Sequence, residues 1–422
     1  MRINTSIFVP PPTGGLNFRD PYQIMPQTDA IVLDDCIARQ NGVETRGGWR
    51  EHQTGLNVSG NTIVETLLPY NAHSMVDDRL FACIGNRIID VTAGGSTPPA
   101  GLTVSNVSDS FWHSTQFQTS TNNFLCAVNN GGGFWTYDPV NGWVKRTLTN
   151  GPANIDSITS VSVWKKRLLF TFANDSRFYY LAPEAIAGAL SPFDLGPQMK
   201  HGGTLVATTS FTRDGGSDIE DYLVAFGSEG DVIVYAGYDP WNVANFQLVG
   251  SWYVGPFPRR PTFYTTVGSD LYILCETGIV PLSMLVGGRW SPAVLQNPIT
   301  GKIEAPLRDS LVRTRYDNRW EVFTIPALGV LVLKQPQQTL PYHLMWVMNI
   351  GTGAWSNFNG VPAHSCAVLR DTFYFGTTDG RVARAFSSDL ANDGILLNGT
   401  GGSVIEATIQ AAFLSFGNSG QL

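Results

Sequence analysis

The sequence contains few charged residues, which make up 14% of its 422 positions, against roughly 25% in an average soluble protein. Hydrophobic residues nevertheless reach 43%, so the chain can bury a large core and is not disordered as a whole. Its 27 basic and 34 acidic residues give a net charge of −7. A broad basic surface that binds nucleic acid by neutralising phosphates is therefore not expected.

Cysteine and histidine are scarce as well. The five cysteines lie far apart in the sequence and form no zinc knuckle or C-x-x-C motif, which favours buried thiols in a reducing compartment. The six histidines never fall within five residues of one another, so the sequence has no local zinc motif. A nucleophile elbow and a P-loop are also missing. We therefore predict no catalytic, cofactor or metal site and expect the protein not to be an enzyme.

Long apolar runs are absent too. The first residues, MRINTS, lack the apolar segment of a signal peptide, and no stretch approaches the length needed to span a bilayer. We expect neither secretion through a signal peptide nor insertion into a membrane.

Glycine, proline and aromatic residues are abundant. The chain has 44 Gly, 25 Pro, 11 Trp, 14 Tyr and 23 Phe. Gly and Pro interrupt helices and form turns, whereas aromatic residues favour strands. This composition predicts an all-β protein with many short strands.

A pair of short apolar strands joined by a Gly, Asn or Asp turn recurs after residue 60. The first strands are centred at residues 82, 126, 170, 224, 273, 331 and 374, with a mean spacing of about 49 residues. This period is typical of β-propeller blades, four-stranded sheets that bury their faces against one another. We predict a propeller of six or seven blades over residues 61–395; a sandwich or two stacked barrels is the alternative.

Residues 1–60 predict an extended N-terminal arm, because a proline run and a Gly pair precede sequence without a regular period. Residues 396–422 contain one further strand, which we expect to return to the arm and form a small β platform with it. The apolar residues of the arm cannot bury much surface alone and are expected to become ordered against a neighbouring subunit. The candidate assembly contacts are Leu16, Phe18, Arg19, Ile31, Leu33 and Trp49.

Two loops are candidates for contact with a partner or a channel. Residues 213–221 carry alternating carboxylates that could bind Ca²⁺, but they lack the EF-hand pattern, so a solvated loop is expected. Residues 256–261, PFPRRP, hold two arginines in a rigid loop suited to a carboxylate or a phosphate. The candidate residues are Asp214, Asp218, Arg259 and Arg260.

The arm also carries the most specific pattern in the chain: GGLNFRDP at 14–21, MP at 25–26, DAIVLDD at 29–35 and GVETRGGW at 42–49. This pattern resembles the opening of the tail nozzle proteins of short-tailed phages, a family also called tail accessory, tail tubular B or packaged-DNA stabilisation proteins. The motif-like part covers roughly 40 residues, and the blade pattern follows it.

The resemblance implies a homo-hexamer of propellers in the virion tail, made in the bacterial cytoplasm. Such a ring lies below the head-tail adaptor ring, retains the packaged genome and carries fibres or tailspikes. DNA is expected to pass through it without specific binding, with residues 214–221 and 254–261 as candidate gate loops. The sequence departs from the family at its end, where a strand at 408–416 is soon followed by Leu422; this puts part of the family's platform in doubt.

The alternative is a propeller-fold glycosidase or lyase that acts on bacterial surface polysaccharide. It predicts a monomer with carboxylates gathered on one face, whereas a tail component predicts a ring-forming protein without catalysis. The missing S-x-D-x-G-x-T-W repeats and histidine clusters favour the tail component.

Overall fold

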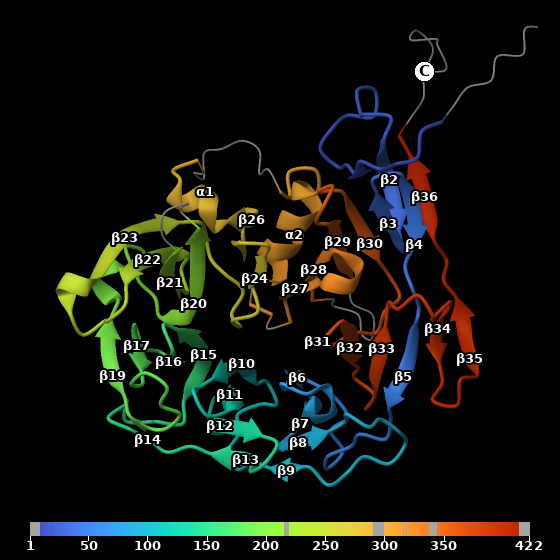
Figure 1. Ribbon diagram of the computed structural model, residues 1–422. Coiled ribbons are helices and arrows are strands. Elements are labelled where there is room, and N and C mark those ends of the chain that lie inside the picture. Colours follow the sequence, from blue (N-terminus) through green and yellow to red (C-terminus); the bar gives the residue numbers. More distant parts are fainter. Residues whose placement is uncertain are drawn as a thin grey trace, which may run out of the picture.

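The computed structural model is a β-propeller, in which antiparallel sheets surround a central axis (Figure 1). The structure describes residues 9–214, 219–289, 299–314, 316–317, 319–336 and 344–412. In this part of the chain, six blades have four strands each and a three-stranded sheet takes a seventh position in the ring. The predicted fold class is confirmed.

Blades 1 to 4 follow one another along the chain. Blade 1 comprises β6 (Thr66–Tyr70), β7 (Arg79–Ile84), β8 (Arg87–Asp90) and β9 (Leu102–Thr103). Blade 2 comprises β10 (His113–Gln118), β11 (Asn123–Asn129), β12 (Gly133–Asp138) and β13 (Gly142–Lys145). Blade 3 comprises β15 (Ile158–Trp164), β16 (Arg167–Phe172), β17 (Arg177–Tyr180) and β19 (Ser191–Asp194). Blade 4 comprises β20 (Leu205–Asp214), β21 (Ile219–Gly227), β22 (Asp231–Gly237) and β23 (Phe246–Tyr253).

The three-stranded sheet lies between blades 4 and 5 and is followed by two helices. Its elements are β24 (Tyr264–Val267), β25 (Asp270–Cys275), β26 (Gly278–Pro281), α1 (Leu282–Val286) and α2 (Glu304–Thr314). Blade 5 comprises β27 (Glu321–Ile325), β28 (Val330–Lys334), β29 (Met345–Asn349) and β30 (Trp355–Phe358). Blade 6 comprises β31 (Ser365–Leu369), β32 (Thr372–Gly376), β33 (Val382–Ala385) and β5 (Trp49–Gln53).

Shorter elements connect or extend the blades. They are the hairpin β3 (Cys36–Arg39) with β4 (Gly42–Thr45), the parallel pair β14 (Leu148–Thr149) with β18 (Gly188–Ala189), the hairpin β34 (Asn392–Ile395) with β35 (Gly401–Val404), and the 3-10 helices η1 (Met75–Asp77), η2 (Gly196–Gln198), η3 (Val243–Asn245) and η4 (Pro326–Leu328).

The predicted hairpins form the second and third strands of the sheets. In blade 2, for example, β11 and β12 pair in register from Leu125 opposite Tyr137 to Asn129 opposite Gly133. The turn between them needs glycine at 131, because φ is 94° and a Cβ there would lie 2.2 Å from a backbone oxygen. Middle strands are buried on both faces by neighbouring blades, so they read as continuous apolar runs that stand out in the sequence.

The N-terminal segment completes the last blade. Strand β5 pairs antiparallel with β33, with Trp49 opposite Ala385, and the chain then continues into blade 1. The predicted boundary at residue 60 is therefore wrong, because residues 49–53 belong to the propeller. This pairing holds the ring together between its first and last blades.

The predicted platform is not separate from the propeller. Strand β2 (Asp29–Asp34) pairs with β1 (Gly15–Leu16) and with β36 (Thr408–Ala411), so the arm and the C-terminal part lie side by side (Figure 1). Strand β2 also meets β30 at Asp34 opposite Asn357, so this sheet continues into blade 5. Burial of apolar arm residues against the blades gives the platform and the propeller a shared core.

Candidate functional site

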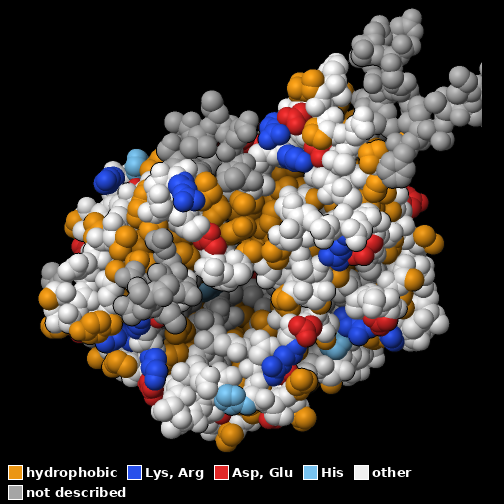
Figure 2. Space-filling model, turned by 45° about the horizontal axis from the view of Figure 1, so that its top comes forward, with side chains coloured by type: hydrophobic (Ala, Val, Ile, Leu, Met, Phe, Trp, Pro, Cys, Tyr) orange, Lys and Arg blue, Asp and Glu red, His pale blue; other side chains and the backbone are white. Residues whose placement is uncertain are grey.

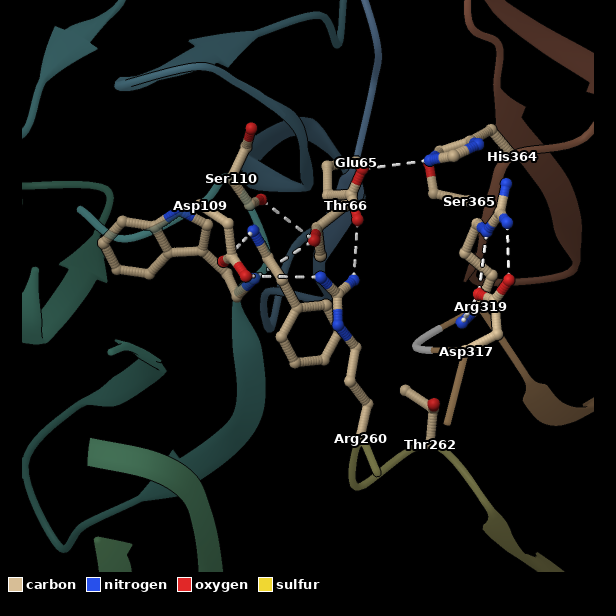
Figure 3. A network of polar contacts seen from close by, with 12 residues as sticks. Glu65, Thr66, Asp109, Ser110, Arg260, Thr262, Asp317, Arg319, His364 and Ser365 are labelled. Carbon is tan, nitrogen blue, oxygen red and sulfur yellow. Dashed lines mark hydrogen bonds and ion pairs between the residues drawn. The ribbon is translucent and has the colours of Figure 1, made fainter. Parts of the chain in front are cut away.

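Residues that precede the innermost strands meet at one end of the propeller axis. The innermost strands of the sheets are β6, β10, β15, β20, β24, β27 and β31, which together line an axial cavity. Innermost strands of a propeller start on the same face, so their preceding loops converge there. Figure 3 shows the resulting network of polar side chains.

Arg260 connects three parts of the ring within this network. Its guanidinium donates to Glu65 Oε1 at 2.7 Å and lies 3.4 Å from Asp109 Oδ2. It also lies over the Phe111 ring, 3.9 Å from the centroid. Only 12% of the Arg260 side chain and 19% of the Glu65 side chain are exposed, so this ion pair is only weakly screened by solvent. The loop before β24 is thereby held against blades 1 and 2.

Glu65 is shared between two partners, Arg260 and His364. Its second oxygen, Oε2, lies 3.0 Å from Nε2 of His364, the residue before β31. Burial opposes ionisation of Glu65, but the hydrogen bond to His364 and the charge of Arg260 outweigh it and lower the pKa to about 2. Glu65 therefore remains a carboxylate at neutral pH and joins blade 1 to blade 6.

A buried lysine extends the network toward blade 5. Lys334 on β28 is fully buried and donates to Glu321 Oε1 on β27 at 2.9 Å. It also donates to the backbone oxygen of His364. Arg319, just before β27, donates to Asp317 Oδ1 at 2.8 Å. Arg and Lys thus face the carboxylates at this end of the axis, which suits fixing the blades in place.

The axial cavity has a volume of about 440 Å³ and opens at a hollow in the face shown in Figure 2. Serine and threonine side chains from several blades line it, together with His113. His113 Nδ1 accepts a hydrogen bond from the Val161 amide at 3.2 Å. Burial lowers the pKa of His113 to about 4, so its ring is neutral at pH 7 and joins blade 2 to blade 3.

This arrangement differs from that of a glycoside hydrolase. Such an enzyme needs a carboxyl group with a raised pKa as general acid, opposite a second carboxylate. Here the pKa of Glu65 is lowered, and Glu321 is paired with Lys334. Among the described residues, no group of three His, Cys, Asp or Glu side chains is arranged to bind a metal ion. The described side-chain contacts at this end of the axis therefore link blades to one another.

Glu65→Gln is expected to destabilise the protein by about 1–3 kcal/mol at neutral pH, because Arg260 and His364 lose their anionic partner. The pKa of Glu65 in the folded state is about 2, below its ordinary value of 4.5. The stabilisation by ionised Glu65 is therefore complete above pH 4.5 and is lost as pH falls toward 2. Urea unfolding at a series of pH values measures the free energy of unfolding of variant and parent. The difference between the two should shrink as pH falls from 4.5 toward 2.

The control for this experiment is Glu44→Gln, because Glu44 pairs with Arg39 at the surface and is 52% exposed. Its effect should stay below about 0.5 kcal/mol. An effect of Glu65→Gln that is equally small would contradict the proposed linkage.

Three of the predicted assembly contacts lie inside the chain's own core, which corrects that prediction. Leu16 and Leu33 pack in the core shared with blade 5, and Trp49 packs on Phe375 of blade 6 at 5.5 Å between ring centroids. These side chains are not accessible to a neighbouring subunit, because pairing of the arm strands with the blades covers them.

The other three predicted contacts lie at the surface of the platform. Phe18 is 43% exposed and meets Trp346 edge-on at 6.2 Å. Arg19 donates to Asp20 at 2.8 Å, and the half-buried Ile31 lines a shallow groove with residues 17–23. Their involvement in assembly stays a prediction.

The predicted loop residues have different environments. Asp214 is the last residue of β20, and Asp218 lies outside the described residues. Arg259 lies over the Tyr316 ring at 4.9 Å. Arg260 does bind carboxylates, as its sequence context suggested, but they belong to the same chain.

Sequence analysis missed Glu65, Glu321, Lys334 and His364. Each stands alone in an apolar or mixed stretch, and the partners Arg260 and Glu65 are 195 residues apart. No local motif marks such contacts, although each blade repeats a loop before its innermost strand. Aligning the blades on that loop would have placed Glu65 and His364 at similar positions.

The cysteines agree with the predicted buried thiols at four of five positions. Cys36, Cys83, Cys126 and Cys275 are buried, and Cys366 is half-buried. Burial raises the pKa of Cys275 to about 11, so the thiol stays protonated.

No helix in the described part of the chain is long and apolar enough to cross a membrane.

The fold and the ion-paired axis define a β-propeller protein whose blades are linked at one end of the axis. No family model and no curated protein match the chain. One similar solved structure, BBS1N in complex with ARL6DN, has 10% identity and a TM-score of 0.47, and the match covers 82% of this chain and 99% of that chain.

Two other similar structures are the computationally designed Ika8 protein and BamB from Moraxella catarrhalis. The Ika8 match has 11% identity and a TM-score of 0.44 and covers 81% of this chain and 100% of that chain. The BamB match has 12% identity and a TM-score of 0.39 and covers 79% of this chain and 85% of that chain. At these values the similarities carry no information about function.

Proposed function

We propose that the protein is a structural component of the tail of a short-tailed phage, where several copies form the nozzle that closes the DNA channel. The proposal rests on the resemblance of the arm to tail nozzle proteins. The observation that carries it is the pairing of β2, which lies within the motif-bearing arm, with β36 beside the propeller. A propeller with an attached platform is the architecture that the resemblance implies.

The described contacts suit a rigid building block. Arg260, Glu65 and His364 join separate parts of the ring through buried polar contacts, and β5 completes the last blade. A propeller held in this way can transmit force from attached fibres without opening. Head-tail adaptor proteins above and fibres or tailspikes at the sides are the partners of this proposed role.

In this proposal DNA passes between copies and not along the axis of one propeller. The Arg260–Glu65 pair crosses one end of that axis, and the cavity of about 440 Å³ is far too small for a duplex. The net charge of −7 per copy would repel DNA from a shared lumen. Figure 2 shows charges of both signs scattered over one face, without a continuous basic field.

Immunogold electron microscopy of purified phage particles, with antibodies against this protein, tests the proposal. We expect label at the tip of the tail, together with tryptic peptides of the protein in the particle proteome. Absence of the protein from the particles would overturn the proposal.

The purified protein is expected to bind duplex DNA no more tightly than about micromolar at physiological salt, because its net charge of −7 opposes the approach of phosphates. Fluorescence anisotropy with labelled duplex at two salt concentrations measures this. Tight binding with a steep salt dependence would contradict a repulsive lumen. Release of sugars from bacterial surface polysaccharide would instead favour the glycosidase or lyase alternative.

A further inference from the structure

The axial cavity is large enough to hold a small molecule. Its volume of about 440 Å³ lies within the range of pockets that bind small ligands, roughly 300–1,000 Å³. Figure 2 shows the hollow through which it opens. The innermost strands of all seven sheets contribute to its wall, so a molecule in the cavity contacts several blades at once.

Several polar groups of the wall have no partner within the protein. In the part of the chain that the structure describes, the hydroxyl groups of Ser114, Thr115 and Ser210 make no hydrogen bond. The hydroxyl of Ser365, by contrast, donates to the backbone oxygen of Val64 at 2.7 Å. Each innermost strand also pairs on one side only, so its other edge presents backbone N–H and C=O groups to the axis. Water, or a ligand with hydroxyl groups of its own, satisfies such donors and acceptors.

The charged groups of the wall are balanced by other residues of the chain. Glu65 pairs with Arg260 at 2.7 Å, and Glu321 pairs with Lys334 at 2.9 Å. His113 is neutral at pH 7. An ion that entered the cavity would lose hydration without meeting an uncompensated opposite charge on these groups. The wall therefore favours a neutral ligand.

Apolar groups lie among the polar ones. The partly exposed aromatic side chains of Phe111, Tyr264 and Phe323 line the cavity. Aromatic rings bury apolar C–H surface, whereas hydroxyl groups and carboxylate oxygens hydrogen-bond to O–H groups and fix the orientation of a ligand. A molecule that carries both C–H faces and many O–H groups matches this wall, and sugars have this chemistry.

We propose that the axial cavity binds a neutral sugar of one or two rings, held by Ser114 and Thr115 of blade 2 and by Ser210 of blade 4. Binding without cleavage is expected, because Glu65 is ionised and Glu321 is paired with Lys334. The cavity of about 440 Å³ leaves no room for a polysaccharide chain. This inference goes beyond the proposed function and does not depend on it, since the site lies within one copy.

Ligand-observed NMR and isothermal titration calorimetry with D-glucose, D-galactose, N-acetyl-D-glucosamine and maltose test the site. We expect at least one of these sugars to bind with a dissociation constant of about 0.1–10 mM, because hydrogen bonds to water are exchanged for bonds to protein at a small net gain. Citrate and choline, an anion and a cation, should bind more weakly. Binding of none of the four sugars, or tighter binding of citrate or choline, would overturn the proposal.

Substitutions in the wall show whether the sugar occupies this cavity. Ser210→Leu fills part of the space and should weaken binding by at least about tenfold. Ser210→Ala removes only the hydroxyl group and should weaken binding by about two- to tenfold. The matched control is Ser96→Leu, at an exposed position between β8 and β9, which should leave the affinity unchanged. An affinity of Ser210→Leu equal to that of the control would overturn the proposal.

A crystal structure with the tightest-binding sugar gives a measurement that needs no variant. The sugar should lie in the axial cavity within hydrogen-bond distance of Ser114 or Ser210, and a sugar found only at the outer surface would overturn the proposal. Thermal melting without sugar checks that each variant folds like the parent. The milder Ser210→Ala keeps the affinity test in force where Ser210→Leu does not fold.

Discussion

A variant without residues 1–50 is expected not to fold into a stable propeller. The deletion removes Trp49 from β5, the fourth strand of blade 6, and takes Leu16 and Leu33 out of the shared core. Loss of a closing strand exposes an edge of β33 and the apolar faces on both sides. Size-exclusion chromatography and thermal melting should show aggregation or loss of the cooperative transition.

Point variants within the arm separate a core role from a docking role. Leu33→Ala should lower the free energy of unfolding by about 2–5 kcal/mol, because Leu33 is fully buried. Ile24→Ala is the matched control, since Ile24 is 73% exposed and surface changes usually cost less than about 0.5 kcal/mol. A truncated protein that melts like the parent would show that the arm only docks onto neighbours.

Arg46→Met is expected to cost about 3–5 kcal/mol of stability at neutral pH, because breaking a buried ion pair leaves the partner charges uncompensated. The Arg46 side chain is 1% exposed and lies 2.6 Å from both Asp35 and Asp393. It thereby joins the arm to the segment that carries β34. Chemical unfolding with far-UV circular dichroism measures the loss.

The pH dependence of this variant has a definite sign. Burial raises the pKa of Asp35 even beside Arg46, and removing the arginine raises it further. Protonation therefore relieves the unpaired charge, so the deficit of Arg46→Met should shrink as pH falls below neutral. Arg313→Met is the control, because Arg313 is 69% exposed in its pair with Asp309. This substitution should change the free energy of unfolding only slightly. Equal losses in the two variants would contradict the role assigned to Arg46.

The sequence alone determined the propeller, because its signal is local. In most hairpins the two strands are separated by only a few residues, as between Asn129 and Gly133 in blade 2, although β28 and β29 of blade 5 are joined by a longer loop. Each turn glycine therefore lies close in sequence to the apolar runs that it joins. The runs are easy to recognise because strands that are buried on both faces are apolar at consecutive positions. Counting these hairpins left the number of blades open between six and seven, and the structure has six four-stranded blades and one three-stranded sheet in its described residues.

Tertiary structure alone decided which arm residues are buried and which charges meet. Trp49 pairs with Ala385 across almost the whole chain, and Asp35 accepts a hydrogen bond from the Asn359 amide, 324 residues away. A short apolar strand looks the same in sequence whether it completes a blade of its own chain or docks on a neighbour. Ion pairs such as Arg260 with Glu65 depend on ring closure, which brings together loops that no local pattern relates.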